Sequence, residues 1–268
     1  MPSTSYTVNC SILLTDLPLL ERPAAARAAG FTQVELWWPF AGSVPSDAEV
    51  TRFERAITDA GVQLTGLNFD AGDMPAGDRG LLSSPATSAR FRDNIDVVVG
   101  IGERLGCRAF NALYGNRDDG SSPQEQDEVG AENLALAAEA VARIGGTVLL
   151  EPVSGAPRYP LLTSGDALGV IDRVRAAGAG ENLRLLADFY HLAVNGDDVD
   201  AVIEQHAADF GHVQVADAPG RGEPGTGDLP LERWIARSAE LGYDGVVGLE
   251  YKSTAADPFA WLPAADRS

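Results

Sequence analysis

Short β-rich runs and longer amphipathic or alanine-rich stretches alternate along the whole chain, with glycine, proline, asparagine or aspartate at their junctions. Such alternation is typical of βα units, in which parallel strands are joined through helices. Several of the longer stretches end in a glycine that is typical of a helix C-cap. The predicted strands are Thr7–Leu13, Gln33–Trp38, Val62–Asn68, Arg108–Leu113, Thr147–Glu151, Arg184–Asp188, His212–Ala216 and Val246–Glu250.

The number and spacing of these units favour one architecture. Eight units in 268 residues give about 33 residues each, which fits a (β/α)8 barrel. No Gly-x-Gly-x-x-Gly follows the first strand, so a dinucleotide-binding sheet lacks its main support. We therefore predict an α/β fold, with residues 1–268 forming a single TIM barrel domain. The predicted helices are Leu19–Ala29, Asp47–Ala60, Phe91–Leu105, Ala131–Ile144, Gly165–Ala176, Asp198–Ala208 and Leu231–Leu241.

Two predicted loops are longer than the others. Asp70–Ala89 follows the third strand, and Gly115–Asp127 follows the fourth. In a barrel the loops at the carboxyl ends of the strands build the active-site face. We therefore expect both segments to cover a substrate.

The charge and the cysteine count exclude several classes of protein. The chain has 20 Lys and Arg against 39 Asp and Glu, a net charge of −19, which disfavours both nucleic acid and anionic lipid as partners. No apolar run approaches the roughly 20 residues of a membrane helix. Met1-Pro2-Ser3-Thr4-Ser5 lacks the basic start of a secretory signal, which predicts a cytoplasmic protein. Cys10 and Cys107 form no Cys-x-x-Cys pair, so we expect two reduced, buried thiols.

Three predicted strands end in an acid, namely Glu151, Asp188 and Glu250. The carboxyl ends of all barrel strands meet at one face, so these side chains should converge at the barrel mouth. Three carboxylates without a cation would raise one another's pKa, and a positive group is therefore expected among them. A single strand-end acid is more often a helix N-cap or an ion-pair partner, but three together indicate a functional site.

Gln214 lies late in the predicted seventh strand and would add a neutral amide oxygen to this face. Three carboxylates and one amide carbonyl form an all-oxygen set of ligands. Such a set suits Mn²⁺ or Mg²⁺ better than zinc, which prefers nitrogen and sulfur. The sequence thus predicts a divalent metal ion, Mn²⁺ or Mg²⁺, as the cofactor.

Two histidines and an arginine are further candidates. His191 follows Asp188 just beyond the sixth strand, either as a donor to a substrate oxygen or as a capping or solvent-facing residue. His212 shares a strand face with Gln214 one layer deeper, which favours a hydrogen-bonded core histidine. Arg221 stands between glycines in the seventh loop, so we expect its guanidinium to bind a substrate carboxylate as a bidentate fork.

Other residues near the strand ends have two interpretations each. Glu35, Lys252 and Asp217 either contact the site or belong to structural ion pairs. Four aromatic residues form either an apolar wall of the pocket or part of the core. They are Trp37, Trp38, Phe40 and Phe69.

With these residues the chain resembles the hydroxypyruvate isomerase family. That family belongs to the wider xylose isomerase-like superfamily of metal-dependent barrels, which also includes ketose 3-epimerases and AP endonucleases of the endonuclease IV type. The resemblance covers nearly the whole chain. It is carried by Asn9-Cys10-Ser11, Gly30-Phe31, Val34-Glu35, Ala71-Gly72-Asp73, Gly77-Asp78-Arg79-Gly80, Glu151-Pro152, Asp188-Phe189-Tyr190-His191, His212-Val213-Gln214-Val215-Ala216-Asp217, Arg221-Gly222-Glu223-Pro224-Gly225-Thr226-Gly227 and Gly248-Leu249-Glu250-Tyr251-Lys252.

The resemblance implies an enzyme, an intramolecular oxidoreductase of the aldose-ketose type that converts hydroxypyruvate to tartronate semialdehyde through an enediolate. It implies Glu151 and Glu250 as the acid/base pair, with His191 and Arg221 binding the substrate. Glutamine at position 214 departs from the histidine usual in ketose 3-epimerases. The implied metal ligands are Glu151, Asp188, Gln214 and Glu250.

Three alternatives remain at this point. Within the same chemistry, the substrate could be a 2-oxo-tetronate, or the reaction could be a ketose 3-epimerisation, and pocket depth decides between them. From a different class, a non-catalytic carbohydrate-binding barrel could hold a structural metal. An AP endonuclease is disfavoured, because the chain has three histidines and a charge of −19. The expected partner is a small hydroxy-oxo acid or sugar, and the family is the basis for expecting a homo-oligomer.

Overall fold

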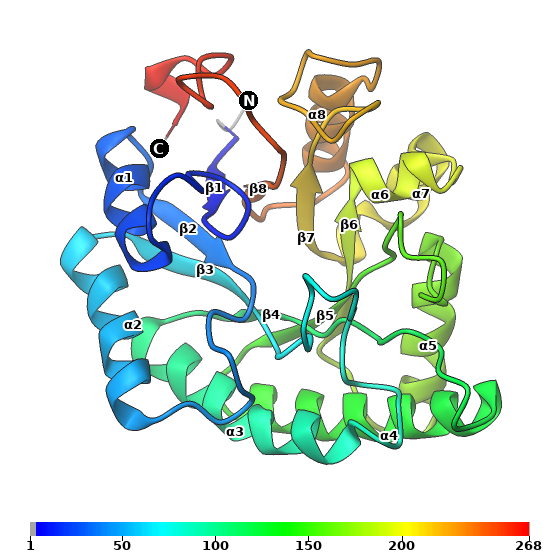
Figure 1. The fold of residues 1–268 in the computed structure, drawn as a ribbon. Coiled ribbons are helices and arrows are strands. Elements are labelled where there is room, and N and C mark those ends of the chain that lie inside the picture. Colours follow the sequence, from blue (N-terminus) through cyan, green and yellow to red (C-terminus); the bar gives the residue numbers. More distant parts are fainter. Residues whose placement is uncertain (1–3, 268) are drawn as a thin grey trace.

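The computed structural model describes residues 4–267 and forms a closed barrel of parallel strands in the order β1 to β8 (Figure 1). Each strand pairs with the next, and β8 pairs with β1, where Tyr6 lies opposite Val247. The predicted (β/α)8 TIM barrel is confirmed. The strands are β1 (Tyr6–Asn9), β2 (Gln33–Leu36), β3 (Gln63–Asn68), β4 (Ala109–Asn111), β5 (Thr147–Leu150), β6 (Leu183–Asp188), β7 (Phe210–Val215) and β8 (Val247–Leu249).

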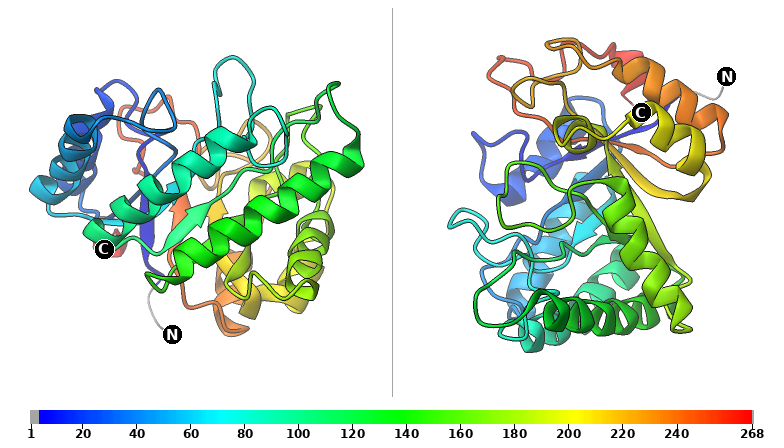
Figure 2. Two further views of the ribbon diagram at one scale, coloured as in Figure 1. Left: turned by 90° about the horizontal axis from the view of Figure 1, so that it is seen from below. Right: turned by 90° about the vertical axis from the view of Figure 1, so that its right-hand side faces the viewer.

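Helices surround the barrel on its outer side (Figure 2). Among residues 4–267 none of them has the length and the apolar character that crossing a bilayer requires. Two predictions involve residues outside the described range and stay predictions. They are the single domain over residues 1–268 and the cytoplasmic location, which was based on Met1-Pro2-Ser3-Thr4-Ser5. The α-helices are α1 (Arg22–Ala28), α2 (Asp47–Ala60), α3 (Ser88–Leu105), α4 (Pro123–Ala142), α5 (Ser164–Ala176), α6 (Phe189–Val194), α7 (Val199–His206) and α8 (Leu231–Glu240).

Three helices begin with a capping box, in which a hydroxyl and a carboxylate each accept from the other residue's backbone N–H. One of them corrects the predicted boundary of α4. The helix begins at Pro123 and not at Ala131, because Ser122 and Glu125 satisfy its first N–H groups. The loop after β4 is therefore residues 112–122, shorter than predicted. The capping pairs are Ser46 with Glu49, Ser122 with Glu125 and Thr163 with Asp166.

The apolar pattern runs past the ends of several strands. β1 was expected to reach Leu13 but ends at Asn9, where the side-chain Oδ1 accepts a hydrogen bond of 3.0 Å from the Ser11 N–H and turns the chain. Leu13 is nevertheless only 1% exposed, because loops at the barrel mouth pack against the core. Burial alone thus does not mark where a strand ends.

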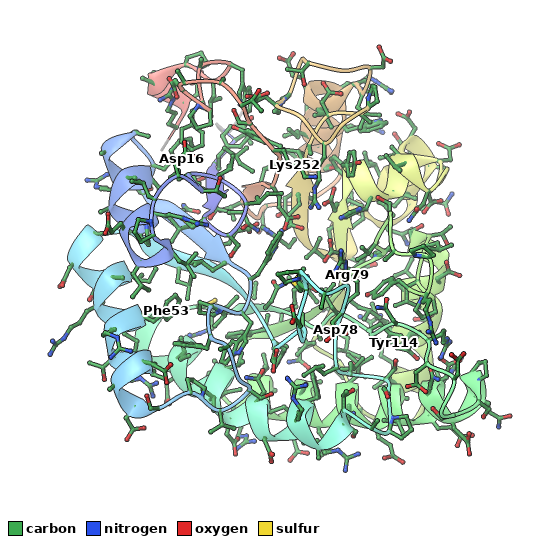
Figure 3. All side chains as sticks on the ribbon, viewed as in Figure 1. Asp16, Phe53, Asp78, Arg79, Tyr114 and Lys252 are labelled. Carbon is green, nitrogen blue, oxygen red and sulfur yellow. The ribbon has the colours of Figure 1, made fainter. Side chains whose placement is uncertain are left out.

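The core lies in the barrel and between the barrel and its helices. Phe69 packs there against Phe91 and Phe110, with ring centroids 5.3 and 6.3 Å away, so it is a core residue and not a pocket wall. Cys10 and Cys107 are both free and fully buried, as predicted. The loop between β3 and α3, residues 69–87, passes near the barrel mouth, where Figure 3 labels Arg79.

Candidate active site

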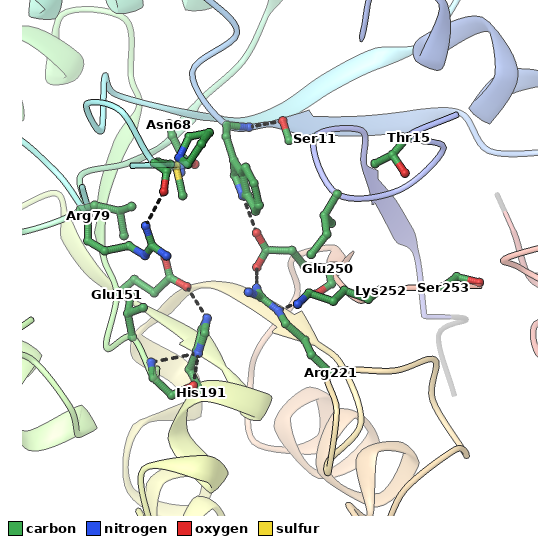
Figure 4. Close-up of a pocket in the computed structure, with 17 residues that line it drawn as sticks. Ser11, Thr15, Asn68, Arg79, Glu151, His191, Arg221, Glu250, Lys252 and Ser253 are labelled. Carbon is green, nitrogen blue, oxygen red and sulfur yellow. Dashed lines mark hydrogen bonds and ion pairs between the residues drawn. The ribbon is translucent and has the colours of Figure 1, made fainter. Parts of the chain in front are cut away.

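The strand ends and the loops that follow them enclose a cleft of about 560 Å³ (Figure 4). Glu151, His191, Arg221 and Glu250 line this cleft. Asp188 is fully buried beside them, with its Oδ2 atom 3.6 Å from both His191 Nε2 and Arg221 Nη2. The structure therefore brings together the three strand-end acids, the histidine and the arginine that the sequence singled out.

Hydrogen bonds fix the two glutamates. Glu151 directly follows β5, and its Oε2 atom accepts a hydrogen bond of 2.7 Å from Asn111 Nδ2 at the end of β4. Glu250 follows β8, and its Oε1 atom accepts from Asn9 Nδ2 at 3.1 Å and from Trp37 Nε1 at 2.5 Å. Each carboxyl group thus has one oxygen held by neutral donors that lie at or just after the ends of other strands.

Asp188 has two roles in the local structure. It is the last residue of β6 and the N-cap of α6, and its Oδ1 atom accepts from the backbone N–H groups of Tyr190 and His191. Its Oδ2 atom is buried and has no hydrogen-bond partner among residues 4–267. A buried carboxylate oxygen without a donor is costly, which indicates that a cation belongs at this position.

Burial and mutual repulsion dominate the electrostatics of the site. Burial, followed by the charges of Glu250 and Asp188, raises the pKa of Glu151 well above its usual value. Burial also raises the pKa of Glu250 to about 8, opposed by Arg221 and reinforced by Asp188. Such shifts are expected for carboxyl groups that share a site with little solvent.

Arg221 is the positive group that the sequence required among these acids. Its Nη2 atom lies 2.8 Å from Glu250 Oε2 and 3.6 Å from Asp188 Oδ2, and its guanidinium carbon lies 5.6 Å from the centre of the Tyr190 ring. The guanidinium therefore faces protein carboxylates in the structure. Its predicted contact with a substrate carboxylate stays a prediction.

His191 is buried in the first turn of α6 and does not lie on an open loop. Its Nδ1 atom accepts a hydrogen bond of 3.0 Å from the backbone N–H of Ser154. Burial lowers the pKa of this histidine to about 4, so the ring is neutral at pH 7 and its proton resides on Nε2. Nε2, which lies 3.9 Å from Glu151 Oε1, is therefore a donor directed at the acids.

Behind the acids lies a second layer of polar residues. Glu35 on β2 accepts from Gln214 Nε2 at 2.7 Å and from Asn9 Nδ2 at 3.1 Å, and His212 Nε2 lies 2.6 Å from its other oxygen. The prediction of a hydrogen-bonded core histidine at position 212 is confirmed. Because Gln214 uses its amide nitrogen on Glu35, its Oε1 atom is turned away from Glu35 and is buried without a partner.

These residues fit a divalent metal ion. Glu151, Asp188 and His191 each offer a ligand atom, and the three atoms lie within 4.8 Å of one another. Two buried oxygens without donors, Asp188 Oδ2 and Gln214 Oε1, belong to the set that the sequence predicts. Since His191 presents an N–H from Nε2, oxygen ligands are the better candidates, and oxygen is what Mn²⁺ and Mg²⁺ prefer.

Several residues of the site escaped the sequence reasoning. Asn9, Asn68 and Asn111 end β1, β3 and β4, just as the acids stand at the ends of other strands. Extending the strand-end rule from acids to amides would have found Asn68 but not Asn9 or Asn111, because the predicted strands that contain those two run on to Leu13 and Leu113. Trp37, for which the sequence allows a pocket wall or a core residue, lines the cleft, and its indole N–H also donates to Glu250.

The remaining candidates divide between the cleft and the scaffold. Lys252 lines the cleft. Asp217 is fully buried and structural, because its carboxylate accepts from four backbone N–H groups of the seventh loop. Trp38 and Phe40 line an adjoining hollow of about 650 Å³ and contact each other, with ring centroids 4.9 Å apart.

Comparisons with known proteins agree with this geometry. Residues 23–266 match the family model of the xylose isomerase-like TIM barrel. A Streptomyces coelicolor protein that is provisionally named hydroxypyruvate isomerase is 55% identical over 98% of this chain and 97% of its own length. The hydroxypyruvate isomerase of Escherichia coli is 30% identical over 92% of this chain and 93% of its own.

A solved structure gives the same result for the fold. The crystal structure of an AP endonuclease of family 2 from Brucella melitensis superposes with a TM-score of 0.86 and is 29% identical. The match covers 97% of this chain and 98% of that one. Similarity therefore extends from end to end and is not confined to the strands of the barrel.

Proposed function

This chain belongs to the hydroxypyruvate isomerase family of xylose isomerase-like TIM barrels, and we propose that its cleft interconverts hydroxypyruvate and tartronate semialdehyde. The reaction moves one proton from C3 to C2 of the substrate and one from the C3 hydroxyl to the C2 oxygen. The observation that carries the proposal is the presence of two buried glutamates, Glu151 and Glu250, in one small cleft around Asp188. Two proton-transfer groups are what this exchange requires.

The metal ligands in this proposal are the four oxygen-bearing side chains predicted from the sequence. Asp188 and Gln214 support it most directly, because each keeps a buried oxygen without a donor. A bound Mn²⁺ or Mg²⁺ would act as a Lewis acid toward the substrate oxygens and stabilise the developing negative charge. The full set of proposed ligands is Glu151, Asp188, Gln214 and Glu250.

Glu151 and Glu250 are the proposed acid/base pair. One of them takes the proton from C3, which leaves an enediolate, and the other delivers a proton to C2. Asn111 holds the first glutamate, and Asn9 and Trp37 hold the second, so each carboxyl group keeps one orientation during the exchange. The guanidinium of Arg221 stabilises Glu250 whenever that carboxyl group is ionised.

His191 is the proposed donor to a substrate oxygen. The Ser154 N–H fixes the tautomer in which Nε2 carries the proton, and Nε2 faces the same space as Glu151 and Asp188. A neutral imidazole donates a hydrogen bond to an oxyanion without first protonating it. This role also explains why the ring is buried and does not need to be charged.

DNA is not the substrate in this proposal, although the Brucella melitensis relative is an AP endonuclease by name. A net charge of −19 would repel a phosphate backbone. The cleft of about 560 Å³ instead suits a small molecule.

The test is a proton-exchange experiment in D₂O. Protein stripped of metal and then loaded with Mn²⁺ or Mg²⁺ is incubated with hydroxypyruvate, 2-oxo-tetronates and a panel of ketoses, and NMR follows deuterium at C3 and formation of the isomer. We expect metal-dependent exchange with hydroxypyruvate. Absence of exchange with every substrate, together with a fall in melting temperature on chelation, would instead indicate a non-catalytic carbohydrate-binding barrel.

The same assay tests the two glutamates. Glu151→Gln and Glu250→Gln should keep the fold, because a carboxamide has the same shape, and should lower turnover by at least ~1000-fold. Glu103→Gln, an exposed change on α3, is the matched control. Wild-type turnover in either cleft variant would remove that glutamate from the mechanism.

A further inference from the structure

A second arginine, Arg79, projects into the cleft from the loop between β3 and α3. It lines the cleft together with Asn68, Glu151 and His191, and Figure 4 shows its guanidinium on the Glu151 side. The side chain is half-buried.

The hydrogen bonds of Arg79 leave much of its guanidinium unused. Its Nη1 atom donates to two backbone carbonyls, Met74 O at 3.0 Å and Asp78 O at 2.6 Å. Among residues 4–267 no carboxylate pairs with Arg79, and no acceptor is found for Nε or Nη2. An arginine held on one edge with its other N–H groups open is prepared to bind a planar anion through a fork.

The loop that carries Arg79 is built to hold it. The Gly80 N–H donates to Ala71 O at 2.9 Å, and the Gly115 N–H donates to Arg79 O at 3.0 Å, so the backbone on both sides of the arginine is fixed. Gly80 has a φ of +112°, and a side chain there would clash with the carbonyl oxygen of Leu113. The position of Arg79 is therefore set by the fold and not by a flexible loop.

The other cations of the cleft are less suited to bind an anion. Arg221 spends Nε and Nη2 on the Glu250 backbone oxygen and carboxylate, so it is already part of the acid cluster. Lys252 lies beyond Glu250 and Arg221 in Figure 4 and is exposed, and its ammonium lacks the planar fork.

We propose that Arg79 binds the carboxylate of the substrate and gives this cleft its preference for 2-oxo acids over neutral sugars. The inference rests on the proposed function and adds to it the residue that separates hydroxypyruvate from neutral sugars. A carboxylate on Arg79 places the adjoining oxo carbon toward Glu151 and His191, which line the same side of the cleft. Arg79 is thus a specificity-determining residue.

The test compares two substrates that differ at one group. Dihydroxyacetone is hydroxypyruvate with the carboxylate replaced by a hydroxymethyl group, and its isomer is glyceraldehyde. In Arg79→Gln we expect kcat/KM for hydroxypyruvate to fall at least ~100-fold, while deuterium exchange into dihydroxyacetone stays within ~3-fold of wild type. For Arg79→Lys, which keeps the charge but not the planar fork, kcat/KM for hydroxypyruvate should lie between the values of wild type and Arg79→Gln.

Binding without turnover gives an independent readout. Calorimetric titration of the Mn²⁺-loaded protein with D-glycerate should show at least ~100-fold weaker binding in Arg79→Gln. Arg104→Gln, which removes an equal charge from the far end of α3, should bind D-glycerate like wild type. Retained exchange into dihydroxyacetone and an unchanged melting temperature show that Arg79→Gln is folded.

The outcomes separate the two proposals. A wild-type protein that binds D-glycerate through Arg79 but does not isomerise hydroxypyruvate would refute the proposed reaction alone. Equal loss on both substrates, or no loss on either, would overturn the assignment of Arg79. Loss of D-glycerate binding in Lys252→Met instead of Arg79→Gln would do the same.

Discussion

Glu35 offers the sharpest test of how the fold orients the site. Its buried side chain is the partner of Gln214 Nε2 and of His212 Nε2, and for each of these it is the hydrogen-bond acceptor found among residues 4–267. Glu35→Met would remove both oxygens at nearly constant length, which leaves two buried donors unpaired. Glu35→Gln is the matched control, because its carbonyl still accepts from Gln214 and Asn9 while its amide donates to His212 in the other tautomer.

The magnitudes differ strongly between the two variants. A buried donor without a partner costs about 1–3 kcal/mol, so Glu35→Met should lose about 2–6 kcal/mol of unfolding free energy. In a chain of this size that is a fall of about 5–20 °C in melting temperature. In Glu35→Gln the free energy of unfolding should differ from that of wild type by less than about 1 kcal/mol. The Gln214 amide is also released in Glu35→Met, so Mn²⁺ affinity should fall about 10–100-fold there and stay within ~3-fold in Glu35→Gln.

Two measurements decide the matter. Calorimetric scans of the metal-free proteins give the stability difference, and titration with Mn²⁺, followed by the loss of the free-ion electron paramagnetic resonance signal, gives the affinity. If Glu35→Met and Glu35→Gln bind Mn²⁺ equally well, the orientation of Gln214 does not depend on Glu35, and its unpartnered oxygen is not a metal ligand.

Two further predictions concern the metal and the thiols. Mn²⁺ at about 100 times its dissociation constant should raise unfolding free energy by about 2.7 kcal/mol in scanning calorimetry, and EDTA should reverse this; an equal rise in Asp188→Asn would contradict the proposed site. Burial raises the pKa of Cys10 and Cys107 to about 12, so native protein at pH 8 should resist iodoacetamide until urea unfolds it. Because the folded-state pKa is the higher one, keeping the two thiols protonated stabilises the fold fully below pH ~8.5, and this contribution is lost as pH rises toward 12. In urea titrations the free energy of unfolding should fall by about 4 kcal/mol from this cause between pH 9 and 10.5, and Cys10→Ala/Cys107→Ala should lack that part of the pH dependence.

The barrel could be predicted from the sequence because its repeating unit is local. Each of the eight strands has its own apolar run, and helix signals follow each of the first seven. The boundaries were harder, since apolar residues such as Leu13 and Leu113 are buried by loop packing beyond the last ladder hydrogen bond. The short helix α6 was missed because six residues show no helical period, and the Asp188 side chain that starts it was already assigned to the site.

The site could be predicted only in part, for a physical reason. A residue after a barrel strand must face the mouth, so Glu151, Asp188 and Glu250 were found from position alone. The contacts between these side chains depend on the register of the strands and on the path of the loops. Neither can be predicted from the sequence of a single strand. The pairing of Glu35 with His212 across the barrel and the approach of Arg79 from a loop belong to this second class.

If Glu250 has the proposed role, the pairing of β8 with β1 also governs when the protein becomes active. Asn9 and Glu250, which share a hydrogen bond, are 241 positions apart. The hydrogen bond from Trp37 likewise cannot form until Glu250 is in place. A chain still on the ribosome acquires Glu151 and Asp188 before Glu250 is added, so until then it lacks the second of the two proposed proton-transfer groups. Chemistry therefore begins only when the last strand closes the ring, a long-range contact of the kind that folds late. Turnover in a refolding experiment would then report completion of the barrel itself. A chain truncated before β8 would keep only part of the proposed ligand set and should have no isomerase activity.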